Sequence, residues 1–470
     1  MSAEIQVDVA IIGAGTAGLY AVREVKRAGK SFVLIDAGPL GTTCARVGCM
    51  PSKVALHAAE LWRMREEHQA YGISGSQQLT IDRDRAWQQV RSQRDDFAGR
   101  GAASAHRAAG DQLLMGRARF IEPTLLAVET EQGAQSIRAG SVIIATGSRP
   151  VMPGFLQSFA EHCFTTDELF ELEQLPQRLG VLGLGAIGLE MGLAMARLGV
   201  EVVAADMAPQ IAGIADPEVG AAALAMFGKE LDIHLGAAAA LEPAEQGVLL
   251  KTAAGDRPVD KVLVALGRRP NVDNLNLAEA GFPLDERGVP LYNPNTLQIG
   301  GLPVFIVGDA NAQRTLMHDA ADEGAIAGYN AARGLRQAFR RKVPLGIAFT
   351  QPDIVSVGAR LDALDADSIL IGSASTEANG RSRILTREHG LLRIYADRTD
   401  GRLLGAAMVG PRGEHVAQLL AVALEQGMNV HQLLQVPFYH PVVEEMVQSA
   451  LQDIARQLPQ GDLPLGLQVL

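Results

Sequence analysis

The sequence contains one pattern twice: an apolar run, a GxGxxG loop, a helix-like stretch and a second apolar run that ends in aspartate. The copies span residues 7–36 and 179–206, and the first glycine is 23 residues from the aspartate in both. The six glycines are Gly13, Gly15, Gly18, Gly183, Gly185 and Gly188. A strand, a tight turn and a helix in this order are typical of dinucleotide-binding domains, so the repeat predicts two Rossmann-like α/β domains in tandem.

Each glycine of such a loop has its own physical task. The first permits a tight turn, the second lets the backbone approach a pyrophosphate, and the third allows close packing of the helix, whose N-terminus attracts phosphate charge. The predicted strands cover residues 7–12, 31–35, 179–182 and 200–205, and the predicted helices end near Ala28 and Leu198. A lone loop of this kind is equally consistent with a structural turn. Two copies, each framed by strands and an acid, favour nucleotide binding.

The aspartates at the ends of the repeats predict the choice of nucleotide. Asp36 and Asp206 are expected to hydrogen-bond ribose hydroxyls. A carboxylate at position 206 suits the free 2′-hydroxyl of NAD and repels the 2′-phosphate of NADP, and no arginine follows within residues 207–210. NAD is therefore the predicted nucleotide of the second copy.

Bulk properties exclude several functional classes. A chain of 470 residues is long enough for two to four domains, and its formal charge of -11 disfavours nucleic acid and anionic membranes as partners. Residues 179–205 are apolar enough to test as a membrane span, but Glu190, Arg197 and Glu201 interrupt them. The N-terminal residues do not resemble a secretory signal, so a cytoplasmic protein is expected.

Two of the three cysteines lie five positions apart in residues 41–53. In a regular helix, residues with that spacing have Cα atoms roughly 8–9 Å apart, beyond the ~7 Å limit for a disulfide. A disulfide between Cys44 and Cys49 therefore requires a distorted helix, and Gly48 supplies the backbone freedom for that distortion. Pro51 is compatible with a first helical turn, where its missing N–H would have no partner. Two free core thiols, or a zinc site with further ligands, are the alternatives.

The segment GTTCARVGCMPSK, residues 41–53, closely resembles the redox-disulfide motif of the class I pyridine nucleotide-disulfide oxidoreductases, among which the dihydrolipoyl dehydrogenases are most similar. Residues 304–310, VFIVGDA, and 349–358, FTQPDIVSVG, extend the resemblance to essentially the whole chain. It implies a homodimer without metal. It also implies an FAD-binding domain at 1–150 and 271–343, an NAD-binding domain at 151–270, and a C-terminal α+β dimerisation domain at 344–470.

The resemblance also implies site residues. Cys44 and Cys49 correspond to the redox pair, with Cys44 the outer sulfur, and His440 to the base that serves the partner subunit. Glu445 corresponds to the carboxylate that orients the base. Lys53 and Glu190 correspond to an ion pair beside the flavin. For His440, Lys53 and Glu190, an ordinary structural role is the alternative. Asp309 is implied as a contact of the FAD ribityl chain. Further implied cofactor contacts are Thr43, Lys53, Thr146, Gly147 and Gly267.

The implied activity is the oxidation of dihydrolipoamide by NAD through FAD, with lipoamide carried by a 2-oxo acid dehydrogenase complex as a possible partner. Thr42, Val442 and Glu444 depart from the family pattern near the implied site, so an NAD(P)H-dependent reductase of another disulfide is an alternative. Asp206 argues against glutathione reductase, and residues 468–470 lack the cysteine pair of mercuric reductases. A non-catalytic FAD and NAD redox sensor is the third hypothesis.

Overall fold

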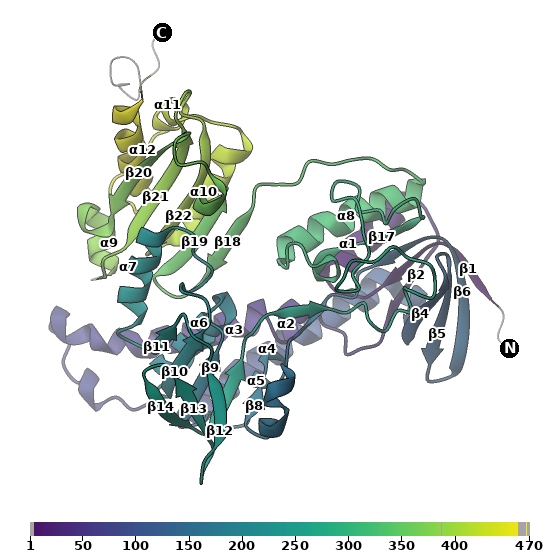
Figure 1. Cartoon of the computed structure of the whole chain (residues 1–470), viewed down its shortest axis with the longest axis horizontal. Helices are drawn as coiled ribbons and strands as arrows, with labels where there is room; N and C mark the ends of the chain where they lie inside the picture. The colour runs from purple at the N-terminus through teal and green to yellow at the C-terminus, as the bar shows by residue number, and fades with distance from the viewer. Residues whose placement is uncertain (1–3, 387, 459–466, 468–470) are drawn as a thin grey trace.

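The computed structural model describes residues 4–386, 388–458 and 467 of the chain. Three main sheets, each with its own helices, form three bodies that meet near the centre of the molecule (Figure 1). The α/β class with a separate C-terminal α+β part is therefore confirmed. Residues 468–470, used above to argue against a mercuric reductase, lie outside the described residues.

The first sheet contains the N-terminal repeat. Its strand order is β3 (Leu113–Met115), β2 (Phe32–Asp36), β1 (Ile5–Ile12), β6 (Gly133–Ile144), β5 (Leu125–Thr130) and β4 (Arg117–Glu122), with β17 (Val304–Ile306) also paired to β6. Strands β3, β2, β1, β6 and β17 are parallel, whereas β4 and β5 add an antiparallel edge. Helices α1 (Thr16–Arg27) and α8 (Met317–Arg333) pack side by side, and α4 (Arg83–Ala109) also contacts α1.

The second repeat forms its own parallel sheet. Its order is β11 (Asp232–Leu235), β10 (Glu201–Asp206), β9 (Arg178–Leu182), β15 (Lys261–Val264) and β8 (Cys163–Phe164). Strands β12 (Ala240–Pro243), β13 (Val248–Thr252) and β14 (Gly255–Val259) add an antiparallel sheet. The flanking helices include α5 (Thr166–Leu169), α6 (Ala186–Arg197) and α7 (Pro217–Phe227). The predicted strands and helices of both repeats are thus confirmed within about two residues at each end.

A two-stranded ribbon joins the two parallel sheets. Strands β7 (Ser148–Pro150) and β16 (Arg268–Pro270) follow the last parallel strand of each repeat and pair antiparallel with one another. The central pair of this ribbon joins Arg149 to Arg269. The chain therefore crosses between the first two bodies where the two repeats end.

The third sheet is wholly antiparallel. Its order is β18 (Leu345–Ala348), β19 (Asp353–Gly358), β22 (Leu403–Gly410), β21 (Leu391–Asp397) and β20 (Ile369–Ser375). Helices α10 (Gly413–Glu425), α11 (Val430–Leu434) and α12 (Glu445–Gln457) share an apolar core with it, and α9 (Gly380–Leu385) lies beside it. The boundaries drawn from the sequence between the three domains stay a prediction.

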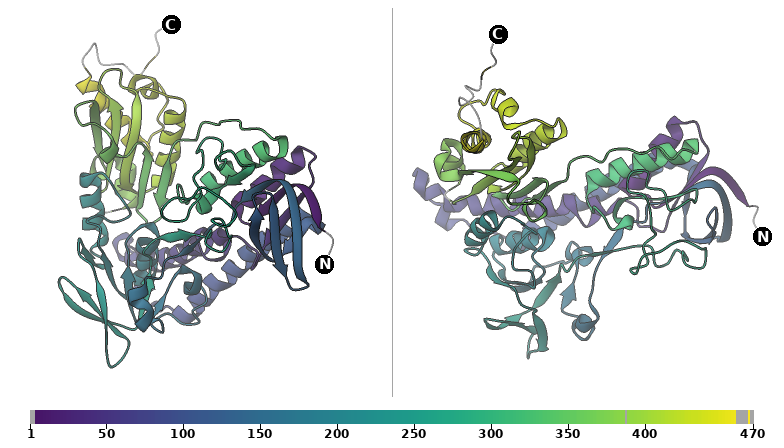
Figure 2. Two further views of the ribbon diagram at one scale, coloured as in Figure 1. Left: turned by 45° about the vertical axis from the view of Figure 1, so that its right-hand side comes forward. Right: turned by 45° about the horizontal axis from the view of Figure 1, so that its top comes forward.

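Helix α7 connects the second body to the third, and the rotated views show it reaching the third sheet (Figure 2). Asp216 caps this helix, accepting hydrogen bonds from the backbone of Glu218 and Val219. The same buried carboxylate accepts hydrogen bonds from Arg393 Nη1 at 2.9 Å and from the Tyr395 hydroxyl at 2.7 Å, both on β21. The second and third bodies are therefore joined by a buried polar contact in which both oxygens of Asp216 are hydrogen-bonded.

Residues 179–205, tested above as a membrane span, fold as β9, α6 and β10. Across the part of the chain that the structure describes, no helix combines the length and the apolar character that crossing a membrane requires.

Close contact between α1 and α8 depends on Gly324. A methyl group at this position would lie 2.1 Å from the carbonyl oxygen of Ala17. We expect Gly324→Ala to lower the free energy of unfolding by about 1–3 kcal/mol, because the helices must separate to admit it. Gly99 in α4 has no atom within 4 Å of such a methyl, so Gly99→Ala should raise stability by roughly 0.5–1 kcal/mol. Urea unfolding checks both values, and equal losses in the two variants would contradict the packing argument.

Candidate active site

Cys44 and Cys49 lie on either side of a helix break. Cys44 belongs to α2 (Thr43–Arg46), whereas Cys49 begins α3 (Cys49–Arg63), and Val47 and Gly48 between them leave the helical conformation. A methyl group on Gly48 would lie 3.1 Å from the Thr43 carbonyl oxygen and 3.3 Å from Cys44 Cα. The predicted distortion is therefore present. The missing side chain of Gly48 lets the two cysteine-bearing turns approach one another.

The two thiols have unequal acidities. Both are free in the structure, and their side chains are hydrogen-bonded to one another. The hydrogen bond from Cys44, assisted by the positive charge of Lys53, lowers the pKa of Cys49 to about 7. The same hydrogen bond, together with burial, raises the pKa of the Cys44 thiol. In the reduced pair Cys49 is therefore the better thiolate, and the charge of Lys53 also favours its departure from a disulfide.

Thr42, which departs from the family pattern, has a backbone conformation that favours glycine. Its φ of 60° and ψ of 147° lie in a region that few residues other than glycine adopt. Its hydroxyl accepts a hydrogen bond from the backbone of Ala45 at 3.2 Å and so caps α2. The threonine thus offsets part of its own backbone strain by stabilising the helix that carries Cys44.

An ion pair lies one turn beyond Cys49. Lys53 Nζ lies 2.7 Å from Glu190 Oε2, and the Glu190 side chain is only 6% exposed. Phe349, between β18 and β19, donates its backbone N–H to Glu190 Oε1 at 2.9 Å, and its ring centroid lies 4.6 Å from Lys53 Nζ. Three segments far apart in the sequence, α3, α6 and the turn after β18, therefore contribute to this pair, which is satisfied by hydrogen bonds and a cation–π contact.

Asp309 is oriented by residues from both ends of the ribbon. Its Oδ2 accepts a hydrogen bond from the Ser148 hydroxyl at 2.6 Å. Arg268 Nε donates to the same Ser148 oxygen at 2.7 Å, and its Nη2 donates to the Ser148 carbonyl at 2.8 Å. Arg268, which follows the second repeat, thereby orients the Asp309 carboxylate through Ser148, which follows the first repeat.

Most of these groups line one cavity of about 480 Å³. The first turns of α1 and α6, which follow the two glycine loops, both border it. Its lining from the sequence-predicted set comprises Gly15, Thr43, Cys44, Cys49, Lys53, Gly147, Glu190 and Asp309. Among the other lining residues are Gly48, Arg268 and Phe349. The cavity therefore brings the cysteine pair, the ion pair and two helix N-termini to one space.

The residues around this cavity fit a dinucleotide. A methyl group on Gly15 would meet no atom within 4 Å, which leaves the backbone open to a phosphate. One on Gly13 would lie 2.2 Å from the Ala145 carbonyl oxygen, and one on Gly18 would lie 1.9 Å from the Gly13 carbonyl oxygen. The buried Oγ1 of Thr146 has no hydrogen-bond partner among the described residues. A pyrophosphate site is expected to have a second glycine with open space beside it, first and third glycines that are closely packed, and a polar group free to bind the ligand. Gly15, the pair Gly13 and Gly18, and the Thr146 hydroxyl match these features.

The second glycine loop repeats this geometry. A methyl group on Gly183 would lie 2.4 Å from the Ala265 carbonyl oxygen, and one on Gly185 would meet no atom within 4 Å. Asp206 accepts hydrogen bonds from the backbone of Leu184 at 2.6 Å and of Ala208 at 2.9 Å. Asp36 does the same for Ala14 and Gly38 at 2.7 Å each. Each aspartate thus stabilises its own loop as well as carrying charge at the expected ribose position.

His440 and Glu445 form a pair outside the cavity. His440 Nδ1 lies 3.0 Å from Glu445 Oε1, and the backbone N–H of Val442 donates to Glu445 Oε2 at 3.0 Å. The hydrogen bond with His440 lowers the pKa of the Glu445 carboxyl. The His440 side chain is 78% exposed and does not line the cavity. Nε2 of an oriented imidazole therefore faces outward from the chain.

Several sequence-predicted residues lie away from the cavity lining. They are Gly13, Gly18, Asp36, Thr146, Gly183, Gly185, Gly188, Asp206, Gly267, His440 and Glu445. Three residues that sequence reasoning missed, Ser148, Arg268 and Phe349, hold Asp309 or Glu190. The matching turns SRP and RRP that end the repeats could have indicated the first two.

The chain matches two family models. Residues 7–324 match "Pyridine nucleotide-disulphide oxidoreductase", and residues 345–451 match the dimerisation domain of the same family. The dihydrolipoyl dehydrogenase of Thermus scotoductus is 32% identical over 465 residues, covering 96% of this chain and 98% of the relative. The dihydrolipoyl dehydrogenase 2 of Haloarcula marismortui is 29% identical, covering 94% and 95%.

Two solved structures have a similar fold. The HOCl-induced flavoprotein disulfide reductase RclA from Escherichia coli, as a Cu(II) complex, has a TM-score of 0.83 at 22% identity. LpdA from Mycobacterium tuberculosis has a TM-score of 0.83 at 23% identity. Each comparison covers 95% of this chain and 99% of the other. At these identities the likeness establishes the fold alone.

The environment of Cys49 predicts how its reactivity changes with pH. In anaerobically reduced protein, alkylation of Cys49 by iodoacetamide should rise with a midpoint near pH 7, because the thiolate is the reactive form. Lys53→Met should move the midpoint upward and Glu190→Gln downward, since Lys53 lowers and Glu190 raises the pKa of this thiol. Peptide mass spectrometry measures the profiles, with Lys53→Arg as the charge-conserving control. Midpoints that move in the same direction in the Lys53→Met and Glu190→Gln variants would contradict the electrostatic account.

Proposed function

The chain belongs to the pyridine nucleotide-disulphide oxidoreductase family, and on that premise we propose that it oxidises dihydrolipoamide with NAD. The coarser activity, that of a flavoprotein disulfide oxidoreductase, follows from the family and its relatives. The observation that carries the proposal is the shared cavity. A cysteine pair, the Lys53–Glu190 ion pair and the first turn after a dinucleotide loop all border one space.

The unequal acidities of the cysteines support a direction of attack. A substrate thiolate forms a bond to Cys44 Sγ while the Cys44–Cys49 bond breaks, and Cys49 leaves as a thiolate. The positive charge of Lys53, which lowers the pKa of Cys49, favours this outcome, because the sulfur with the lower pKa leaves faster. The second substrate thiolate then attacks the substrate sulfur bound to Cys44. Cys44 leaves and takes a proton, so the substrate is oxidised and the cysteine pair is reduced.

The acid–base group comes from the second chain of a homodimer. His440 is exposed and hydrogen-bonded to Glu445, yet it does not line the cavity that contains Cys44. We infer that His440 of the partner subunit faces Cys44, in agreement with the family's dimerisation domain at residues 345–451. The Glu445 carboxylate fixes Nδ1, so that Nε2 accepts the substrate proton and later returns it to Cys44.

The cofactors proposed are FAD and NAD. When bound, they supply the hydride chemistry that carries the electron pair away from the cysteines. The chain's own part is to hold them: Gly15, Gly147 and Asp309 line the side of the cavity next to the first repeat. The carboxylate of Asp206, already fixed by two backbone N–H groups, favours NAD because it would repel a 2′-phosphate.

Dihydrolipoamide is the proposed substrate because full-length relatives at 27–32% identity are dihydrolipoyl dehydrogenases. On this proposal the lipoamide is carried by a 2-oxo acid dehydrogenase complex. The second candidate is an NAD(P)H-dependent reductase of another disulfide, favoured by Thr42, Val442 and Glu444 near the site and by the fold of RclA. A redox sensor without turnover is less well supported, since His440 and Glu445 are hydrogen-bonded for proton transfer.

Anaerobic titration of the yellow holoprotein with dihydrolipoamide distinguishes these functions. For the proposed enzyme, the flavin absorbance should bleach and added NAD should be reduced, with NADP reduced much more slowly. Cys44→Ser should lower turnover at least roughly a thousandfold, because the attacked sulfur is gone. Bleaching by NADPH together with another disulfide substrate would favour the second candidate. No spectral change with any dithiol would support the sensor.

Subunit mixing tests whether His440 acts across the dimer. Cys44→Ser and His440→Gln homodimers should both be nearly inactive. Unfolding and refolding a 1:1 mixture should restore roughly a quarter of wild-type activity, because half of the dimers are mixed and each of these has one intact site. A mixture as inactive as its parents would show that both groups act within one chain. Wild-type protein taken through the same procedure controls for refolding losses.

A further inference from the structure

The loop that carries Asp309 is held by a fully buried carboxylate. Glu323 on α8 is 0% exposed, and its Oε2 accepts hydrogen bonds from the backbone N–H of Gly308 at 2.6 Å and from Asn311 Nδ2 at 2.7 Å. Asn311 also accepts a hydrogen bond from the backbone of Gln313 at 3.0 Å. Both ends of the short segment 308–311 are therefore attached to one side chain.

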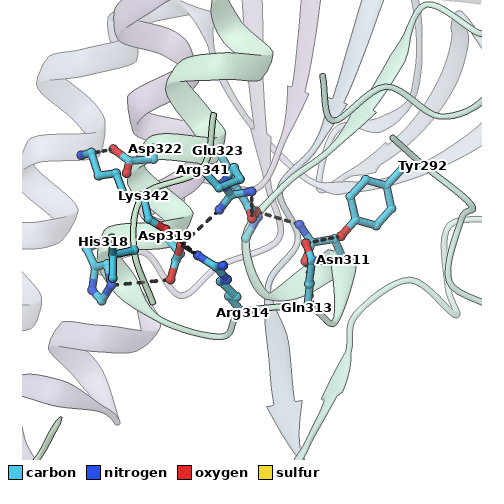
Figure 3. A network of polar contacts seen from close by, with 12 residues as sticks. Tyr292, Asn311, Gln313, Arg314, His318, Asp319, Asp322, Glu323, Arg341 and Lys342 are labelled. Atoms are coloured by element: carbon cyan, nitrogen blue, oxygen red, sulfur yellow. Dashed lines mark hydrogen bonds and ion pairs between the residues drawn. The ribbon is translucent and has the colours of Figure 1, made fainter. Parts of the chain in front are cut away.

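The charge of Glu323 is balanced from outside α8. Arg341 lies in the segment between α8 and β18, and its Nη1 lies 2.7 Å from Glu323 Oε1. Its Nη2 donates to Asp319 Oδ1 at 3.2 Å, so one guanidinium contacts two carboxylates a helical turn apart (Figure 3). Like charges at this spacing repel one another, and burial strengthens the repulsion. Burial raises the pKa of Glu323, and Arg341 opposes that rise.

We propose that Arg341 is a positioning residue for FAD, because by neutralising Glu323 it fixes the 308–311 loop that presents Asp309 to the cavity. The inference rests on the proposed function, in which Asp309 contacts the flavin cofactor. It predicts that the linker to the third body controls how firmly the flavin is held, although Arg341 itself does not line the cavity.

The linker has attachments that do not involve Arg341, so the effect of Arg341 can be separated from folding. Arg314 Nη1 donates to the Lys342 carbonyl oxygen at 3.0 Å, and Lys342 Nζ lies 2.9 Å from Asp322 Oδ1 (Figure 3). Arg314 also lies 3.4 Å from Asp319 and keeps that carboxylate paired. Glu323 has no other cationic partner among the described residues. The Arg341→Met substitution therefore leaves the charge of Glu323 without a cationic partner.

The test is the rate at which FAD leaves the holoprotein. Flavin fluorescence follows release at a temperature where far-UV circular dichroism shows every variant still folded. Arg341→Met should release FAD roughly tenfold faster or more than wild type, because a buried charge without a partner is strongly unfavourable. The matched control is Arg340→Met. Arg340 is 78% exposed and pairs with Glu425, so this change should leave the rate within about twofold.

A second variant tests the charge argument itself. In Arg341→Met combined with Glu323→Gln, the introduced amide oxygen can still accept the Gly308 N–H but carries no charge, so slow release should return. If Arg341→Met alone does not fold, the double variant should fold and retain FAD. A wild-type release rate in Arg341→Met, or no recovery in the double variant, would overturn the inference alone. A wild-type chain that binds no FAD would overturn the proposed function as well.

Discussion

The Lys53–Glu190 ion pair is the contact on which the rest of the site depends, because it joins three segments that lie far apart in the sequence. Lys53 follows the cysteines on α3, Glu190 follows the second glycine loop on α6, and Phe349 comes from the third sheet. A largely buried carboxylate is stable there only while the ammonium and the Phe349 N–H remain in place. The cysteines, the cavity and the third body are therefore positioned together, and the positive charge of Lys53 lowers the pKa of Cys49.

Local physical rules predicted the two repeats and the helix break between the cysteines. The strands, loops and helices of both repeats follow from apolar runs framed by glycines, because these patterns constrain only neighbouring residues. The helix break between Cys44 and Cys49 also followed from geometry, since a regular helix holds such residues too far apart. The resemblance to a known motif supplied what geometry could not, namely the pairing of His440 with Glu445.

The contacts that sequence reasoning missed join residues far apart in the chain. Ser148 and Arg268 are 120 positions apart, and although their matching turns single out both places, neither turn indicates that one residue orients the other. Arg341 lies in a polar segment that is typical of a solvated linker, yet its side chain is only 12% exposed and neutralises Glu323. Long-range pairing of this kind depends on how the bodies pack, and hydrophobic periodicity does not record it. Only the folded structure shows that Arg341 is largely buried and that its charge is balanced by Glu323.

The ribbon between β7 and β16 has a property that follows from its register. Arg149 and Arg269 occupy equivalent places in the two repeats, and they face one another at its centre, while Ser148 pairs with Pro270 and Pro150 with Arg268. Equivalent positions that exchange contacts in this way define a local twofold axis, the arrangement of an isologous dimer interface. At this ribbon the single polypeptide is organised like a symmetric dimer whose subunits have been fused. A substitution at Arg149 is therefore placed directly opposite its own counterpart, Arg269, in the other turn.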